Sequence, residues 1–170
     1  MAAYMIHHPA LTVTLLITGM LLVAGCVTPY DIGGADRRVT PSEAAKDVAG
    51  LLNPHVAWGG EIAAVKNLKN TTELEVVGYP LDSLNRPERT AAPIGRFILI
   101  QSGYLETVDY APGRLITAVG MVKETRRGSV GEANYLYPLL MAEKLQLWPR
   151  PVAERREPTV HFGIGVGISR

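Results

Sequence analysis

The side chain whose setting most clearly specifies a reaction is the thiol of Cys26, the only cysteine among the 170 residues. The residues before it are Leu22-Val23-Ala24-Gly25, so two small residues stand directly upstream of the thiol. A thiol is a nucleophile to which a lipid can be attached, and small residues upstream allow a peptidase to reach the bond between Gly25 and Cys26. This stretch is therefore predicted to be the place where the chain is cut and tied to a membrane.

The segment before Cys26 has the properties of a signal peptide. Residues 1–25 contain no Lys, Arg, Asp or Glu, and residues 10–25 are nearly all apolar. This apolar run is shorter than the roughly 18–20 residues needed to cross a bilayer, but it has the length of a signal-peptide core and ends in small residues. Before it, only the α-amino group, His7 and His8 can carry positive charge, which is less than signal peptides usually have.

The sequence Val23-Ala24-Gly25-Cys26 resembles the bacterial lipobox. This resemblance implies that residues 1–25 are removed and that Cys26 receives a diacylglycerol and an N-acyl chain, which together hold a protein stably at a membrane. Lipoproteins kept at the inner membrane tend to have Asp after the cysteine, so Val27 favours export to the outer membrane. The alternative is a plain signal peptide or short anchor with a chance cysteine. No cofactor other than this covalent lipid is expected.

The composition of the chain argues against several classes of function. The chain has 17 basic and 16 acidic side chains, and this near-neutral balance argues against nucleic acid as a partner and against strong electrostatic binding to anionic lipid. His55 and His161 are too few for a metal site without further ligands. The sequence also lacks a glycine-rich phosphate loop, a Gly-x-Ser-x-Gly motif and a helical histidine pair. We therefore assign no catalytic residue and no metal site.

The part of the chain that follows the cleavage site has the length of one domain. This domain must be stabilised by its hydrophobic core, because a lone cysteine forms no intramolecular disulfide. Residues 26–39 contain proline and glycine without an apolar period and are predicted to form a tether. Residues 40–43 then combine a capping Thr40, a proline and a capping-box Glu43. They predict a short helix from residue 41 to about residue 51 or 52.

Short apolar segments beyond this helix predict β-strands. The first two, residues 56–68 and 72–79, form a predicted hairpin, and Gly59-Gly60 predicts a bulge or bend of the kind that curls a small sheet into a barrel. Further core segments are predicted at residues 96–100, 115–123, 133–141 and 145–148, with a charged turn at residues 124–131. The predicted fold is mainly β, a small antiparallel β-barrel that is OB-like, with one short N-terminal helix; a sandwich is the alternative.

A set of short motifs occurs in order along this region. The motifs are Trp58-Gly59-Gly60-x-Ile62, residues 74–82, Arg86-Pro87, Gly95-Arg96-Phe97, residues 112–120, Gly131-Glu132, Tyr135-x-Tyr137-Pro138 and Leu147-Trp148-Pro149. Together with the lipobox they resemble the Slp family of bacterial outer-membrane lipoproteins, known as starvation-inducible lipoproteins. The resemblance implies an outer-membrane lipoprotein of undefined molecular activity, and we delimit an Slp-like β-barrel domain at residues 40–149. The chain departs from the family at Asn85, where a glycine is common before Arg-Pro, and in its uncharged first residues.

Aromatic and charged residues of these motifs are the candidates for a binding surface. They are Trp58, Tyr79, Asp82, Arg96, Tyr135, Tyr137 and Trp148. The alternative for the tryptophans is packing at the ends of a small core, and tyrosines also suit half-buried strands. The charged members can line a polar site or form arginine–carboxylate pairs that fix long loops. Arg86, Arg114 and Glu132 are open to the same two interpretations.

Two segments follow the predicted domain. Residues 150–158 are polar and charged and are predicted to be a linker. Residues 159–170 alternate apolar residues with glycine, which predicts a strand with one apolar and one bare face. Such a strand can cover an edge of the domain, or it can serve in self-association or membrane contact.

We therefore expect an outer-membrane protein that is held by its lipid, faces the periplasm and is not an enzyme. The first hypothesis is a structural or stress-related interaction module whose partner is an envelope protein or peptidoglycan. The second is a small-ligand or envelope-polymer binding protein that uses the barrel interior or the aromatic surface. The third is a hydrolase of envelope material, which requires Asp82 or Glu132 in a cleft beside a second carboxylate or a histidine.

Overall fold

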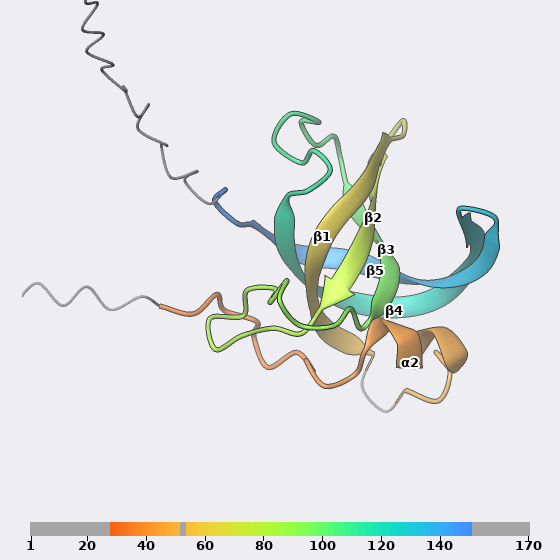
Figure 1. Ribbon diagram of the computed structural model, residues 1–170, viewed down its shortest axis with the longest axis horizontal. Helices are drawn as coiled ribbons and strands as arrows, with labels where there is room; N and C mark the ends of the chain where they lie inside the picture. Colours follow the sequence, from red (N-terminus) through yellow and green to blue (C-terminus); the bar gives the residue numbers. More distant parts are fainter. Residues whose placement is uncertain (1–27, 52–53, 151–170) are drawn as a thin grey trace, which may run out of the picture.

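The computed structural model describes residues 28–51 and 54–150. The predicted signal segment, Cys26 and the glycine-alternating C-terminal strand lie outside these residues. Within the described part, five strands form one sheet that closes on itself in the order β1-β2-β3-β5-β4 (Figure 1). The strands are β1 (His55–Asn67), β2 (Thr71–Tyr79), β3 (Gly95–Ser102), β4 (Leu115–Val130) and β5 (Ala133–Leu147).

The prediction of a mainly β, small barrel with one short helix is confirmed. Four of the neighbouring strand pairs are antiparallel, as predicted, whereas β3 and β5 run parallel and share three register positions. This parallel pair arises because β4 and β5 form a hairpin that enters the ring as a unit, which places β5 beside β3. The number of strands fits the OB-like prediction, since OB-folds are five-stranded barrels.

The first strand bends at the paired glycines, as the sequence predicts. Residues 55–61 of β1 pair with β4, and residues 59–67 pair with β2, so one strand contributes to both sides of the ring. At Gly60 a β-carbon would collide with the carbonyl oxygen of Val77 on β2, so only glycine allows the two backbones to approach this closely. A bulge between Ile62 and Ala64 completes the bend.

Alternating residues of the strands fill the interior of the barrel. Strand β2 shows the pattern most clearly, because Thr72, Leu74, Val76 and Gly78 are buried while the residues between them are half-buried. The buried apolar cluster comprises Ala44, Val56, Trp58, Ile62, Leu74, Val76, Phe97, Leu99, Ile116, Ala118, Val122 and Leu140. The barrel interior is therefore a packed core.

Helix α2 (Pro41–Lys46) begins with the predicted capping box. The side-chain oxygen of Thr40 accepts a hydrogen bond from the Glu43 amide, and the Glu43 carboxylate accepts one from the Thr40 amide. The helix is shorter than predicted because the carboxylate of Asp47 accepts a hydrogen bond from the Gly50 amide, which turns the chain out of the helix. Its Ala44 is fully buried in the barrel core, so the helix closes one end of the barrel.

The predicted tether differs from the structure, because much of it is docked on the barrel. The Tyr30 amide donates to the carbonyl of Leu84, and Asp36 forms a bridge with Val56 at the start of β1. Ala35 is 5% exposed and packs in a second small apolar cluster with Ala57 and Val119. These partners lie 20 to 84 positions away in the sequence, so no local pattern of residues 26–39 reveals them.

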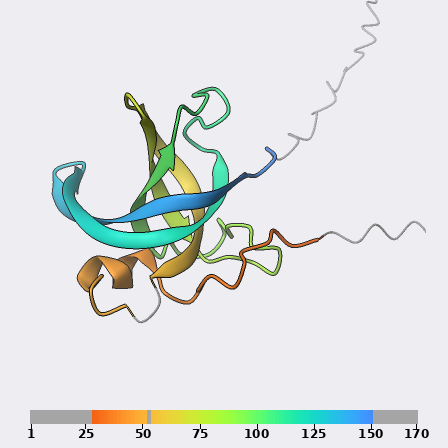
Figure 2. The same cartoon turned by 180° about the vertical axis from the view of Figure 1, so that it is seen from behind.

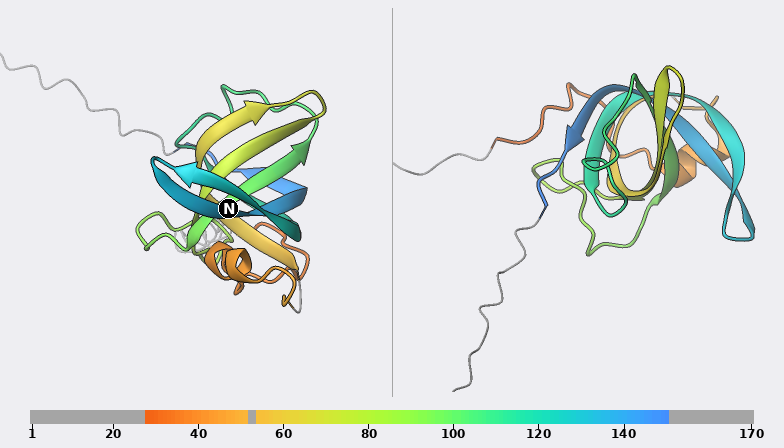
Figure 3. Two further views of the ribbon diagram at one scale, coloured as in Figure 1. Left: turned by 90° about the vertical axis from the view of Figure 1, so that its right-hand side faces the viewer. Right: turned by 90° about the horizontal axis from the view of Figure 1, so that it is seen from above.

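The predicted charged turn at residues 124–131 is wrong. Strand β4 continues to Val130, and a tight turn that contains Gly131 joins it to β5. The charged residues are compatible with a strand because this hairpin projects beyond the ring, as the views in Figures 2 and 3 show. Its Arg126 forms a 2.9 Å ion pair with Glu73 of β2.

Candidate functional site

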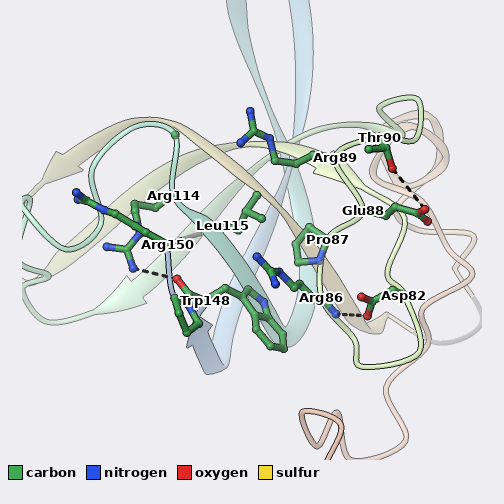
Figure 4. Close-up of a pocket in the computed structure, with 12 residues that line it drawn as sticks. Asp82, Arg86, Pro87, Glu88, Arg89, Thr90, Arg114, Leu115, Trp148 and Arg150 are labelled. Atoms are coloured by element: carbon green, nitrogen blue, oxygen red, sulfur yellow. Dashed lines mark hydrogen bonds between the residues drawn. The ribbon is translucent and has the colours of Figure 1, made fainter. Parts of the chain in front are cut away.

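The candidate site is an open groove of about 330 Å³ on the outside of the barrel (Figure 4). Three segments that are distant in sequence form it: the loop between β2 and β3, the start of β4, and the end of β5. Its lining residues are Asp82, Arg86, Pro87, Glu88, Arg89, Thr90, Gly113, Arg114, Leu115, Trp148, Pro149 and Arg150. The lining therefore contains four arginines, two carboxylates and one tryptophan.

The tryptophan is fixed between the core and an arginine. Its indole N–H donates a 3.0 Å hydrogen bond to the hydroxyl of Thr117, a buried residue of β4. The guanidinium carbon of Arg86 lies 5.8 Å from the centroid of the Trp148 ring, which is within the range of a cation–π contact. Figure 4 shows Arg86 between Trp148 and Asp82.

Arg114 holds the walls of the groove together. It donates a 2.7 Å hydrogen bond to the carbonyl of Asp109 and a 3.0 Å hydrogen bond to the carbonyl of Trp148. Its Nε is buried and has no hydrogen-bond partner within the described residues. This arginine thus joins the loop before β4 to the end of β5, and one of its donors stays unused.

The remaining arginines are more exposed. Arg89 forms a 2.9 Å ion pair with Glu61 of β1, and its side chain is 54% exposed. Arg150 donates a long, 3.4 Å hydrogen bond to the carbonyl of Val108. The ion pair with Glu61 offsets part of the charge of Arg89, whereas the Val108 carbonyl carries no formal charge and leaves Arg150 without an anionic partner in this contact.

The two carboxylates of the groove are already engaged. The Asp82 carboxylate accepts hydrogen bonds from the backbone amides of Leu84 and Arg86, at 2.8 and 2.9 Å. These bonds give Asp82 the role of shaping the loop. Glu88 accepts a weak, 3.5 Å hydrogen bond from the hydroxyl of Thr90. The groove is consequently a cationic surface beside a flat apolar ring, an arrangement that suits an anionic group.

Trp58 and Tyr79 lie away from the groove. Trp58 is 2% exposed, contacts Phe97 with ring centroids 5.2 Å apart, and donates a 2.7 Å hydrogen bond to the carbonyl of Val39. It is a core residue, which is the alternative that the sequence left open. Tyr79 is the half-buried last residue of β2, opposite Gly59.

Arg96, Tyr135 and Tyr137 form a different cluster, which fastens the β4–β5 hairpin to β2 and β3. Arg96 pairs with Glu75 at 2.8 Å, and its amide donates to the Tyr135 hydroxyl at 2.9 Å. The Tyr137 hydroxyl lies 3.0 Å from a Glu75 carboxylate oxygen and 3.1 Å from the carbonyl of Ser129, so it can donate to either. Burial, followed by the hydrogen bond to Glu75, raises the pKa of Tyr137 to about 12.

The model of the outer membrane lipoprotein Slp family matches residues 23–164, which include both the lipobox and the barrel. The chain belongs to the Slp family. It is therefore an outer-membrane lipoprotein, as the motifs predicted.

Relatives within the Slp family are moderately similar to the chain. The uncharacterized lipoprotein YeaY of Escherichia coli (strain K12) is 31% identical over 136 residues, which cover 77% of this chain and 69% of YeaY. Outer membrane protein Slp of the same organism is 28% identical over 138 residues, or 79% of this chain and 73% of the relative. An uncharacterized protein of Haemophilus influenzae is 28% identical over 142 residues, or 80% and 76%. No solved structure matches the chain.

The Slp motifs do not form one surface. Of the seven predicted surface residues, only Asp82 and Trp148 line the groove, with Arg86 and Arg114 from the wider polar set. Arg89 and Arg150 were missed, because one lies in a loop without periodicity and the other in the predicted linker. The sequence feature that points to Arg89 and Arg150 is the presence of arginines in three segments next to strands: the loop between β2 and β3, the start of β4 and the end of β5. Only the fold brings these segments together.

Within residues 28–51 and 54–150, no group of three or more His, Cys, Asp or Glu side chains can hold a metal ion. Among the same residues, no helix has the length and apolar character that a membrane crossing requires.

Proposed function

We propose that this Slp family member is a non-enzymatic interaction module of the outer membrane that binds an anionic group of an envelope component in the arginine groove. The observation that carries the proposal is the charge of the groove, which is lined by four arginines and two carboxylates beside Trp148, with the Asp82 carboxylate held by backbone amides. Guanidinium groups bind carboxylates and phosphates through paired, charge-assisted hydrogen bonds. An aromatic ring beside them offers a flat apolar surface to the rest of the ligand.

The second hypothesis of a carrier that uses the barrel interior is not favoured. The interior is filled by the buried side chains of all five strands, with Trp58 and Phe97 in contact at its centre. A ligand site therefore belongs on the outer surface of the barrel, where the groove is.

The hydrolase hypothesis lacks the geometry that it requires. The Asp82 carboxylate accepts two backbone hydrogen bonds that define its loop. Glu132 is exposed in the turn between β4 and β5 and is not among the residues that line the groove. Asp82 shares the groove with a second carboxylate, Glu88, but its two backbone hydrogen bonds commit it to the loop, and no histidine is among the described residues that line the groove.

The test is anion binding by the full-length lipidated protein in detergent. Inorganic phosphate and muramyl peptides, which carry carboxylates, are titrated while tryptophan emission is recorded. We expect saturable binding that the double variant Arg86→Gln/Arg150→Gln weakens strongly. The matched control Lys123→Gln/Arg127→Gln removes the same charge from exposed positions of β4 and should bind like the wild type. Absence of saturable binding, or equal loss in both variants, would refute the proposal.

A further inference from the structure

The docked N-terminal segment limits how far the barrel can lie from the membrane. Tyr30 is fixed on the barrel, because its amide donates to the Leu84 carbonyl at 3.2 Å and its carbonyl accepts from the Asn85 side chain at 2.9 Å. Cys26 precedes Tyr30 by four residues. Four residues span about 14 Å when fully extended. A lipid on Cys26 therefore holds the loop that contains Leu84 close to the bilayer surface.

The same loop forms one wall of the arginine groove. Asp82 and Arg86, which line the groove, are two positions to either side of Leu84. In Figures 1 and 2 the N-terminal segment, the loop between β2 and β3 and the end of β5 lie on one side of the barrel. The β4–β5 hairpin projects from the opposite side. The position of the anchor thus selects the groove side as the side that faces the membrane.

From these positions we infer that the groove side lies on the membrane surface and that its arginines bind the phosphate groups of lipid headgroups. This inference rests on the proposed function of the groove and on acylation of Cys26. Charge complementarity supports it, because headgroup phosphates are anions that guanidinium groups bind well. The attraction acts over about 8–10 Å at physiological salt, which is comparable to the reach of the free chain.

The near-neutral charge of the whole chain does not oppose this inference. The balance of 17 basic and 16 acidic side chains averages over the surface, whereas the groove gathers four arginines and only two carboxylates. The rim also offers apolar contact, because the side chain of Val108 is 75% exposed and its carbonyl accepts the hydrogen bond from Arg150. Tyr104 in the same loop is 64% exposed and has the amphipathic character of residues at membrane interfaces.

The lipid alone suffices to attach the protein to the membrane, so the role left to the groove is to orient the barrel. Two or more acyl chains hold a protein stably at a membrane, so the groove adds little to the amount that is bound. Its effect is to keep one face of the barrel against the headgroups and to direct the β4–β5 hairpin away from the membrane. Substitution of the groove should therefore alter orientation and leave attachment intact.

The two tryptophans allow a direct test of this orientation. The full-length lipidated protein is reconstituted in vesicles of phosphatidylethanolamine and phosphatidylglycerol, with or without a phospholipid that carries a nitroxide on its headgroup. Trp148 lies in the groove, whereas Trp58 is 2% exposed and serves as the internal reference. We expect the nitroxide to cause a loss of emission that the Trp148→Phe variant lacks. Molar salt should restore this emission, because it screens the attraction between arginine and phosphate.

Variants then separate groove binding from chance proximity. Arg86→Gln/Arg150→Gln should lose the nitroxide effect on Trp148 while the protein still sediments with the vesicles. Lys123→Gln/Arg127→Gln should keep the effect. Equal quenching in wild type and groove variant, or no quenching in the wild type, would overturn the inference. Protection of Trp148 by peptidoglycan sacculi instead of by lipid would also overturn it.

The two levels of the proposal fail in different ways. If phosphate binds in detergent but the nitroxide has no effect in vesicles, the groove binds anions and its orientation has been inferred wrongly. If no anion binds in detergent, the proposed function itself is wrong, and the inference fails with it.

Discussion

Asn85 links the N-terminal segment to the barrel, and its replacement is the most informative test of that link. The residue is 8% exposed and has a φ of 61°, in the left-handed region that glycine and asparagine tolerate. Its side chain donates to the Tyr30 carbonyl at 2.9 Å and accepts from the Arg37 guanidinium at 2.8 Å. Its own carbonyl accepts from the Thr117 hydroxyl at 2.7 Å. The family glycine that is common here provides the backbone angle but not the two side-chain bonds.

The expected loss of stability follows from these contacts. A neutral hydrogen bond contributes about 0.5–1.5 kcal/mol, and one to a charged group contributes about 1.5–3 kcal/mol. Because Arg37 is exposed, the lower values apply, and Asn85→Gly should cost about 2 kcal/mol. Asn85→Ala loses the same bonds and adds about 1 kcal/mol of left-handed backbone strain. Its total cost should be about 3 kcal/mol.

The assay combines urea unfolding with hydrogen exchange on the full chain in detergent. The free energy of unfolding should be highest for the wild type, lower for Asn85→Gly and lowest for Asn85→Ala. Amide exchange should accelerate at Tyr30 and Asp36, which donate to Leu84 and His55, while the amides of β2 and β3 stay protected. Unchanged exchange at Tyr30 and Asp36 would refute the linking role of Asn85. A glycine variant less stable than the alanine variant would refute the argument from the backbone angle.

Three further predictions concern the barrel, the hairpin and the anchor. Gly120→Ala should strongly lower the free energy of unfolding in urea, because the added β-carbon would collide with the backbone carbonyl of Met141. A variant as stable as the wild type would contradict this packing. The raised pKa of Tyr137 means that its neutral form stabilises the fold below about pH 10, and that this contribution is lost as pH rises from about 10 towards 12. Tyr137→Phe should therefore remove that part of the pH dependence of stability, which measurements of Tm across this range will check. Cys26→Ser should leave an unlipidated precursor that still carries its signal segment; palmitate labelling of wild type and variant to the same extent would exclude the lipobox.

The local features of the fold could be predicted from the sequence. The strand over residues 115–123, the β1–β2 hairpin and its glycine bend follow from alternation and turn residues within a few positions. The capping box at Thr40 and Glu43 is likewise a short-range pattern, and the structure contains both of its hydrogen bonds. Each of these features depends on contacts between residues that are close in sequence.

The features that depend on distant contacts could not be predicted. Residues 30–36 have no apolar period, because backbone hydrogen bonds to Leu84 and to the start of β1 hold them in place. The extension of β4 through charged residues pairs with residues 133–139 of β5, and its Arg126 forms an ion pair with Glu73, 53 positions away, which the local pattern of charges does not reveal. The groove depends on three such separate segments, so the sequence alone identified some of its residues but not their assembly.

The attachment of the N-terminal segment determines how much of the chain acts as a free connection to the membrane. With Tyr30 docked, four residues separate the barrel from Cys26; with the segment released as far as Arg37, eleven residues do. The maximum reach then grows from about 14 Å to about 38 Å, which exceeds the range of the electrostatic attraction several-fold. Loss of the two Asn85 side-chain hydrogen bonds, about 2 kcal/mol, raises the population of the released segment about thirtyfold. The hydrogen bonds of Asn85, together with those of Tyr30 and Asp36, keep the connection short, so the orientation of the barrel depends on this buried side chain as well as on the lipid.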